Sequence, residues 1–158
     1  MHAKDLLLAK NGAGVMIVGL LAGFGWAFAL LGEVALSPIP IVLADSFPGD
    51  PSNWRAVHTG CLMNGVMALA IAGVMGRFNL SEKEATRVAF CVIFAIWANT
   101  IFYIANLSAP NRSLSIGDNA LGEASVMGAI GYVTALIGGI TLIYALVVML
   151  RSGKDTNS

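Results

Sequence analysis

The chain has 158 residues, no net formal charge, and a composition that excludes a soluble globular domain. Hydrophobic residues make up 57% of it and charged residues 11%, whereas soluble domains give about a quarter of their positions to charged side chains. Nine basic residues are balanced by nine acidic ones, with no basic patch to attract nucleic acid. The composition therefore predicts an integral membrane protein without a nucleic-acid partner.

Four apolar segments follow one another along the chain. They run roughly over residues 12–32, 56–76, 85–107 and 122–150. About 20 residues of helix, at about 1.5 Å each, cross a hydrocarbon core of about 30 Å. We therefore predict an all-α fold, an integral membrane four-helix bundle in which residues 1–158 form a single membrane domain.

The basic residues predict how the helices are oriented in the membrane. They gather in the N-terminal tail, in the connection 77–87 and in the C-terminal tail, which leaves Arg55 and Arg112 for the other two connections. Cytoplasmic segments carry the excess of Lys and Arg in membrane proteins. Both termini are therefore expected in the cytoplasm, with the two longer loops outside.

Sequence signals also mark where two helices begin. Asp50, followed by a proline, is typical of an N-cap and first helical position. Ser81 and Glu84 have the Ser-x-x-Glu spacing of a capping box. The second and third helices are predicted to start at these residues.

Small residues predict close helix packing. Gly19 and Gly23 form a small-xxx-small pair in the first span. A phosphate-binding glycine loop is disfavoured, since it would need a preceding strand. In the second span, Gly60 and Gly65 would leave room for a bulky group. The fourth span presents a face of Gly128, Gly131, Ala135 and Gly139.

His58 is the one histidine expected at membrane depth, because His2 lies in the N-terminal tail. A neutral imidazole inside lipid is a strong ligand for a metal or for haem iron. The alternative is a structural histidine that is hydrogen-bonded to a neighbouring helix. No second histidine is available for bis-histidine ligation, so iron on His58 would keep an open position unless Met63 or Met67 filled it.

A polar stripe runs along the third span. Asn99, Tyr103 and Asn106 are spaced i, i+4 and i+7, which places them on one face of a helix. Amides and a phenol facing lipid would be costly, so the stripe should point into the bundle. Counting along the spans puts Tyr103 at the level of His58, and Asn99 near the depth of Asn64. These groups are expected to form a site that opens outward.

Two charged residues lie near the outer ends of the spans. Arg112, in the third connection, would pair with an anion such as a haem propionate, with Asp118, or with lipid phosphate. Glu33 ends the first span and is expected at the level of the lipid headgroups. Its alternative role is that of a substrate or proton carboxylate in a small exporter.

Taken together, these motifs resemble the styrene oxide isomerases, a family of bacterial membrane enzymes. The patterns WxxxHxGxxxNG and WANxxFY are specific in combination, and length and four-span layout agree over nearly the whole chain. The matching residues are Trp54 to Gly60, Asn64 to Met67, Trp97 to Asn99, Phe102, Tyr103, Pro110 to Arg112, Gly117, Asn119 and Gly122.

The resemblance implies an isomerase that converts aryl epoxides such as styrene oxide to arylacetaldehydes by Meinwald rearrangement, with ferric haem b as Lewis acid. His58 would be the axial iron ligand, with Arg112 and Trp97 also binding the cofactor. The catalytic residues that it implies are Tyr103, Asn64 and Asn99.

The resemblance also implies a homotrimer with haem near the protomer interfaces, in the bacterial cytoplasmic (inner) membrane. Its partners would be the lipid bilayer, a small apolar epoxide, and an upstream monooxygenase that supplies the epoxide. One position departs from the family. The styrene-degrading members have an aspartate two residues before the tryptophan of the WAN motif, where this chain has Ala95. The natural substrate therefore stays open.

Two alternatives are kept beside the isomerase. The first is a haem-binding membrane protein without isomerase activity, either a sensor or a His/Met electron carrier, whose spectrum would not respond to epoxides. The second is a small four-helix transporter, which would contain no haem and would depend on Glu33.

Overall fold

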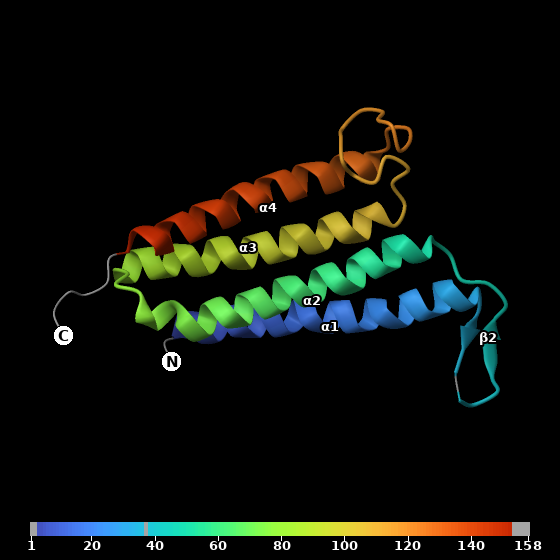
Figure 1. Ribbon diagram of the computed structural model, residues 1–158, viewed down its shortest axis with the longest axis horizontal. Coiled ribbons are helices and arrows are strands. Elements are labelled where there is room, and N and C mark those ends of the chain that lie inside the picture. Colours follow the sequence, from blue (N-terminus) through green and yellow to red (C-terminus); the bar gives the residue numbers. More distant parts are fainter. Residues whose placement is uncertain (1–2, 37, 153–158) are drawn as a thin grey trace.

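The computed structural model describes residues 3–36 and 38–152, so that His2 and Lys154 of the two tails lie outside the described residues. Within these ranges, four helices are long and apolar enough to cross a membrane, which confirms the predicted all-α membrane fold (Figure 1). The helices are α1 (Ala3–Leu31), α2 (Pro51–Val74), α3 (Glu82–Asn106) and α4 (Val126–Arg151). The short elements are strands β1 (Val34–Ala35) and β2 (Val42–Ala44) and the 3-10 helix η1 (Met75–Arg77).

The two predicted helix starts are confirmed. The Asp50 carboxylate accepts the backbone N–H of Ser52 at 2.6 Å and caps α2. At the start of α3, the Ser81 N–H donates to the Glu84 carboxylate at 2.8 Å, and the Glu84 N–H donates to the Ser81 hydroxyl at 3.3 Å. Both are local interactions, which is why the sequence alone locates them.

The starts of α1 and α4 differ from the prediction. α1 begins at Ala3 rather than near residue 12. Its first turns are held by contacts with the other helices, among them an ion pair between Lys4 and Glu82 at 3.5 Å and the full burial of Leu8. α4 begins at Val126 rather than near residue 122, because Ser125 caps it by accepting the Gly128 N–H.

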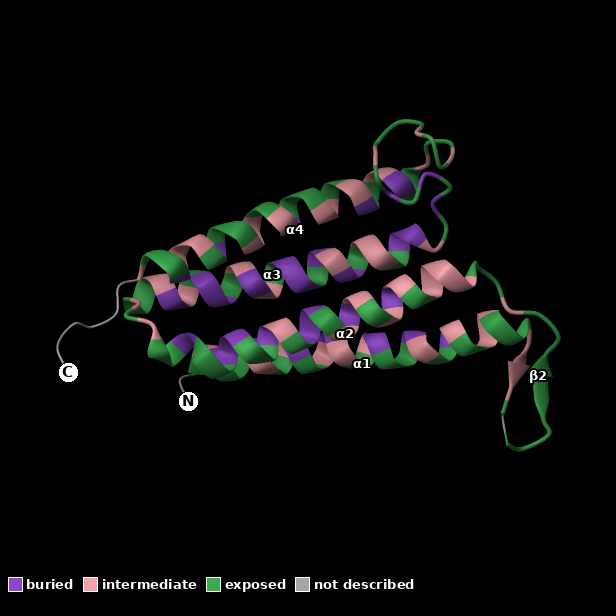
Figure 2. Cartoon of the chain, viewed as in Figure 1, coloured by how far each residue is buried: buried purple, intermediate pink, exposed green. Residues whose placement is uncertain are grey.

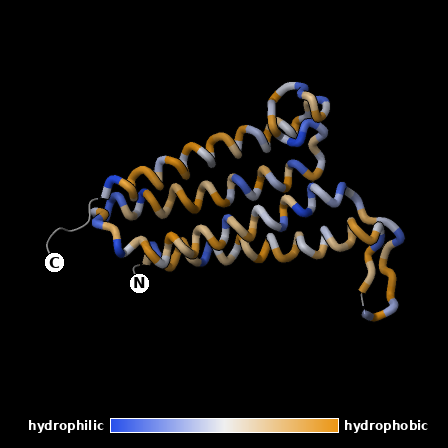
Figure 3. Tube along the Cα trace, viewed as in Figure 1, coloured by the Kyte–Doolittle hydropathy of each residue, from blue (hydrophilic) through white to orange (hydrophobic). Residues whose placement is uncertain are grey.

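The helices lie side by side in a slab (Figure 1). α1 packs along α2, α3 packs against both of them, and α4 packs mainly against α3. Buried residues follow the seams between helices (Figure 2). The long helices are largely hydrophobic (Figure 3), and many of their large apolar side chains are exposed, among them Leu21, Phe90 and Ile143. This distribution suits a protein that is surrounded by lipid.

Glycines permit the close approach of α1 and α2, as predicted. A Cβ added at Gly12 would lie 3.0 Å from the Gly65 carbonyl oxygen, and one added at Gly19 would lie 3.1 Å from the His58 carbonyl oxygen. The space beside Gly65 holds the Met16 side chain, so the bulky group expected there comes from α1.

The predicted small face of α4 needs one correction. Gly128 and Gly131 pack against Asn111 and Ser113 of the preceding loop, whereas nothing lies within 4 Å of the position of a Cβ on Gly139. Gly138 takes its place and packs against Ala98 of α3. The loop covers the first turns of α4, where Gly131 also approaches Ala105 of α3, and Gly138 meets α3 further along the helix.

Gly65→Ala is expected to destabilise the fold by about 1–3 kcal/mol, because the new methyl would overlap the Gly12 carbonyl oxygen and Met16. Gly73→Ala is the matched control on the same helix, since nothing lies within 4 Å of its Cβ position. It should be neutral or slightly stabilising. Thermal unfolding in detergent measures both, and equal midpoints for the two variants would contradict the packing described.

Candidate functional site

His58 reaches from α2 to the backbone of α1. Its Nδ1 lies 2.8 Å from the carbonyl oxygen of Gly19. A carbonyl only accepts, so Nδ1 carries the proton and donates, and Nε2 keeps its lone pair. Gly23 makes room for the ring, because a Cβ there would lie 2.8 Å from Nδ1. The ring of Trp26 lies alongside, with centroids 5.8 Å apart.

His58 therefore makes the hydrogen bond to a neighbouring helix that a purely structural histidine would make. Its Nε2 is still available as a ligand nitrogen. Histidines that bind metals usually donate their other ring N–H to a carbonyl or carboxylate, which fixes the tautomer and orients the ring. Among the described residues, no group of three or more His, Cys, Asp and Glu side chains could hold a metal ion. Nε2 of His58 is the ring nitrogen that remains available to a metal or to haem iron.

A polar cluster connects α2 with α3. Asn99 donates from Nδ2 to Oδ1 of Asn64 at 3.4 Å. Asn64 is 8% exposed, and its own Nδ2 makes no full hydrogen bond to any of the described residues. Tyr103 lies beside Asn64, and its ring fills the space left by Gly60. The expected levels are thereby confirmed, since Asn99 meets Asn64 and Tyr103 lies beside the turn of α2 that carries His58.

The third member of the stripe extends this cluster outward. Asn106 is 7% exposed, and its backbone oxygen accepts the Asn53 side chain at 3.3 Å. Asn99 and Tyr103 are half-buried. The stripe does point into the bundle, as predicted.

The histidine and the polar cluster nevertheless lie on different sides of α2. His58 packs on α1, whereas Gly60, two residues later, packs on Tyr103 of α3. At about 100° per residue, these positions are about 160° apart around the helix. Within one chain, the structure brings Asn64, Asn99 and Tyr103 together and leaves His58 apart from them.

Arg112 lies at the mouth of the bundle. It and Ser113 both have φ of +54°, a left-handed conformation that is unusual for residues other than glycine. The buried Asn111 side chain holds the loop by donating to the carbonyls of Ser115 and Gly117 at 2.9 and 3.1 Å. Arg112 has not paired with Asp118, which accepts the Ala124 N–H instead.

The Arg112 guanidinium points towards the start of α2. Its Nη2 donates to the Ser52 hydroxyl at 3.3 Å. The pKa of the Asp50 carboxyl is lowered, mainly by hydrogen bonds from Ser52 and to a smaller extent by the charge of Arg112. Asp50 and Arg112 border a groove of about 380 Å³ that is also lined by Asn53 and Ser108. An exposed cation at this place is available to an anionic group.

The other two predicted residues take different positions. The Trp97 indole donates to Oδ1 of Asn11 at 2.9 Å and so ties α3 to α1, while 37% of the residue stays exposed. Its cofactor role stays a prediction. Glu33 lies just beyond the last residue of α1 and is half-buried, as expected for a residue at the end of a span.

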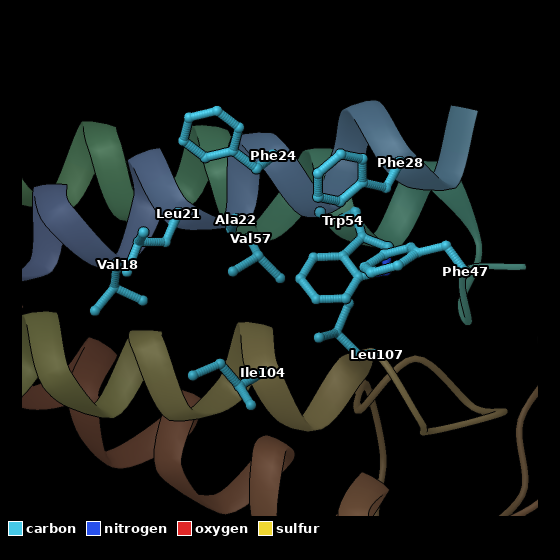
Figure 4. Close-up of a pocket in the computed structure, with 11 residues that line it drawn as sticks. Val18, Leu21, Ala22, Phe24, Phe28, Phe47, Trp54, Val57, Ile104 and Leu107 are labelled. Carbon is cyan, nitrogen blue, oxygen red and sulfur yellow. The ribbon is translucent and has the colours of Figure 1, made fainter. Parts of the chain in front are cut away.

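An apolar pocket of about 440 Å³ lies where α1, α2 and α3 meet (Figure 4). Phe28 of α1, Trp54 of α2 and Phe47 of the intervening loop line one end, and the rings of Phe47 and Trp54 lie 5.4 Å apart. Val57 also lines it, next to His58, whose ring is turned towards α1. No periodic pattern in the sequence predicts this pocket, because Phe47 reaches it from an irregular loop.

Comparisons with known proteins agree with one another. A family model described as styrene oxide isomerase matches residues 4–153. A styrene-oxide isomerase of Pseudomonas fluorescens is 29% identical over 149 residues, which covers 94% of this chain and 88% of that relative.

Proposed function

This chain belongs to the styrene oxide isomerase family, and we propose that it converts aryl epoxides such as styrene oxide to arylacetaldehydes by Meinwald rearrangement, with ferric haem b held by His58. Membership of the family makes the chain an epoxide isomerase, and its four apolar helices are consistent with a multi-pass membrane protein. The family therefore favours the enzyme over a carrier or an exporter. The aryl substrate and the haem are the proposal.

The observation that carries this proposal is the environment of His58. Its Nδ1–H is committed to the Gly19 carbonyl at 2.8 Å, which leaves Nε2 as the only ring nitrogen free to bind iron. Ferric haem bound there would supply a Lewis acid that polarises a C–O bond of the epoxide. Arg112 would pair with a propionate, and the exposed part of the Trp97 indole would contact the porphyrin.

Asn64 is suited to position the epoxide oxygen. Among the described residues its Nδ2 makes no full hydrogen bond, although the Tyr103 side chain lies near it, and such a buried donor is costly unless a ligand supplies an acceptor. Asn99 fixes the orientation of this amide by donating to its oxygen. The epoxide oxygen is such an acceptor, so Asn64 would bind the substrate while Asn99 orients Asn64.

Tyr103 would act on the carbon side of the reaction. When the benzylic C–O bond opens, positive charge develops on the benzylic carbon. A hydride then moves from the neighbouring carbon, whose oxygen becomes the aldehyde carbonyl, so that no atom or electron is gained or lost. The face of an aromatic ring stabilises a nearby cation. Apolar surroundings exclude the water that would otherwise trap the cation as a diol.

A homotrimer would unite the two halves of the site. His58 and Asn64 are six residues apart, so their side chains leave α2 about 120° apart, and we propose that the His58 side of one copy faces the Asn64–Asn99–Tyr103 side of a neighbouring copy. The large apolar area of α4 that is exposed beyond its contact with α3 leaves room for such packing.

We further propose that the enzyme lies in the bacterial cytoplasmic membrane with both termini in the cytoplasm. The distribution of Lys and Arg supports this orientation. An upstream monooxygenase would supply the epoxide, and the apolar substrate would reach the enzyme through the bilayer.

His58→Ala should abolish haem binding, because the ligand nitrogen is lost. The Soret absorption of the purified protein should disappear, and the rate of aldehyde formation from styrene oxide should fall at least about 100-fold, or ~2.7 kcal/mol. His2→Ala is the control for loss of a histidine. Purified wild-type protein that isomerises epoxides at full rate without haem would contradict the mechanism.

Gly60→Ala should lower the rate about tenfold, or ~1.4 kcal/mol, because its methyl would displace the Tyr103 ring. Haem content should stay unchanged, since His58 faces the other side of α2. Thr59→Ala is the matched control, because Thr59 is exposed and its hydroxyl bonds only to the Arg55 carbonyl of the same helix among the contacts described. If both variants lost activity equally, Tyr103 would not be the reason.

Mixed oligomers should distinguish a shared site from one within a single chain. His58→Ala and Asn64→Ala subunits with different affinity tags would be co-expressed, and oligomers that carry both tags would be purified. A site shared between copies regains part of the wild-type rate, because one interface combines an intact His58 with an intact Asn64. Mixed oligomers as inactive as each variant alone would exclude a shared site.

A further inference from the structure

The connection between α1 and α2 carries an unusual apolar projection, the 34–44 hairpin (residues 34–36 and 38–44). Its sequence has no charged residue between Glu33 and Asp45. β1 and β2 pair antiparallel, and the hairpin extends sideways from the end of α1, across the direction of the helices (Figure 1). It lies at the end of the bundle remote from the described ends of the chain.

The side chains of the hairpin are apolar and exposed on both of its faces. Val42 and Leu43 are neighbours on β2, so they point to opposite faces. They are 50% and 63% exposed, and Ile39 near the tip is 55% exposed. A hairpin that lay on a protein surface in water would have one polar face. Both arms are coloured as hydrophobic as the membrane helices (Figure 3).

Among the described residues near the tip, two backbone N–H groups are hydrogen-bonded within the hairpin. The N–H of Leu36 donates to the Ile41 carbonyl at 3.0 Å, and the N–H of Ile41 donates to the Ile39 carbonyl at 2.8 Å. Pro38 and Pro40 have no N–H. Unpaired backbone N–H and C=O groups keep irregular segments out of lipid, and these two hydrogen bonds and two prolines lower the number of unpaired donors among the described residues of the tip. The outer edges of the two strands carry backbone N–H and C=O groups that do not pair within the hairpin. Such groups suit the hydrated headgroup region of the membrane rather than its hydrocarbon centre.

The apolar surface of the hairpin continues that of α1. Leu30 and Leu31, in the last turn of α1, are 64% and 60% exposed on a helix that spans the membrane. The chain then passes Glu33 and enters the hairpin within three residues of Leu31. Glu33 and Asp45 would hold the base of the hairpin at the headgroups, since carboxylates are costly within lipid.

We infer that the 34–44 hairpin is an interfacial membrane anchor that inserts into the leaflet on the loop side of the bundle. It lies along the boundary between headgroups and acyl chains, with Ile39 and Leu43 in contact with lipid. Phe47, which follows the hairpin, lines the apolar pocket with Phe28 and Trp54, so the anchor also holds this pocket at the level of the outer part of the leaflet. The inference depends on the membrane fold and not on haem.

The anchor is testable with a fluorescent label in phospholipid vesicles. Ile39→Cys would be labelled with the environment-sensitive fluorophore NBD and reconstituted with or without doxyl-labelled phosphatidylcholine. Asp45→Cys, at the charged base, is the matched control. The unsubstituted chain, labelled in parallel, corrects for Cys61 and Cys91, which are buried and half-buried. Retained isomerase activity reports that each labelled variant is folded.

The label at Ile39 should emit at shorter wavelength than the label at Asp45, should be quenched by the doxyl lipid, and should be protected from aqueous iodide. Emission at long wavelength with iodide quenching would place the hairpin in water. Protection from both quenchers would place it against protein, such as a second copy of the chain. Either result would overturn the inference. Leu43→Cys tests the other arm independently if Ile39→Cys does not fold.

Discussion

The hydrogen bond from His58 to the Gly19 carbonyl is the contact on which the candidate site depends. A carbonyl within a helix already accepts the N–H four residues later, and the side chain of that residue normally stands beside it. Here that residue is Gly23, and a Cβ on it would lie 2.8 Å from His58 Nδ1. The absence of this side chain exposes the carbonyl to the imidazole. Gly19 and Gly23 therefore allow α1 to pack closely on α2, and the same two residues orient the His58 ring.

α2 carries different polar groups on the side that faces α1 and on the side that faces α3. Towards α1 it presents His58, and towards α3 it presents Asn64 together with Gly60, whose missing side chain admits Tyr103. The two sets of groups lie on different sides of α2, and this separation is the reason for the proposal that the site is completed between copies. Among the described residues, the buried Asn64 Nδ2 makes no full hydrogen bond. A buried donor that is unsatisfied in one copy is a reasonable cost where a substrate or a second copy supplies the acceptor.

The sequence predicted at which level along the helices the polar residues lie. It predicted only in part which neighbouring helix their side chains face. Capping at Asp50 and Ser81 depends on neighbours in the sequence, so the starts of α2 and α3 and the common levels of Asn64 and Asn99 follow from counting. The first turn of α1 forms an ion pair between Lys4 and Glu82, which lies far along the chain. No local sequence pattern predicts such a contact. In the same way, the stripe on α3 predicted that its residues face inward but not which neighbour they meet. That depends on which helices are adjacent, and here α3 separates α4 from the other two.

The departure at Ala95 can be interpreted in the same terms. Ala95 is fully buried, and a Cβ on Gly138 of α4 would lie 3.4 Å from its carbonyl oxygen and 3.6 Å from Oδ1 of Asn99. This position therefore belongs to the seam between α3 and α4, where a carboxylate would have to find a partner or remain neutral. A residue there would affect the proposed site indirectly, through how closely α4 approaches α3 beside Asn99. Alanine allows close packing without a buried charge. The difference from the styrene-degrading members thus bears on the shape of the site and leaves its hydrogen-bonding groups in place.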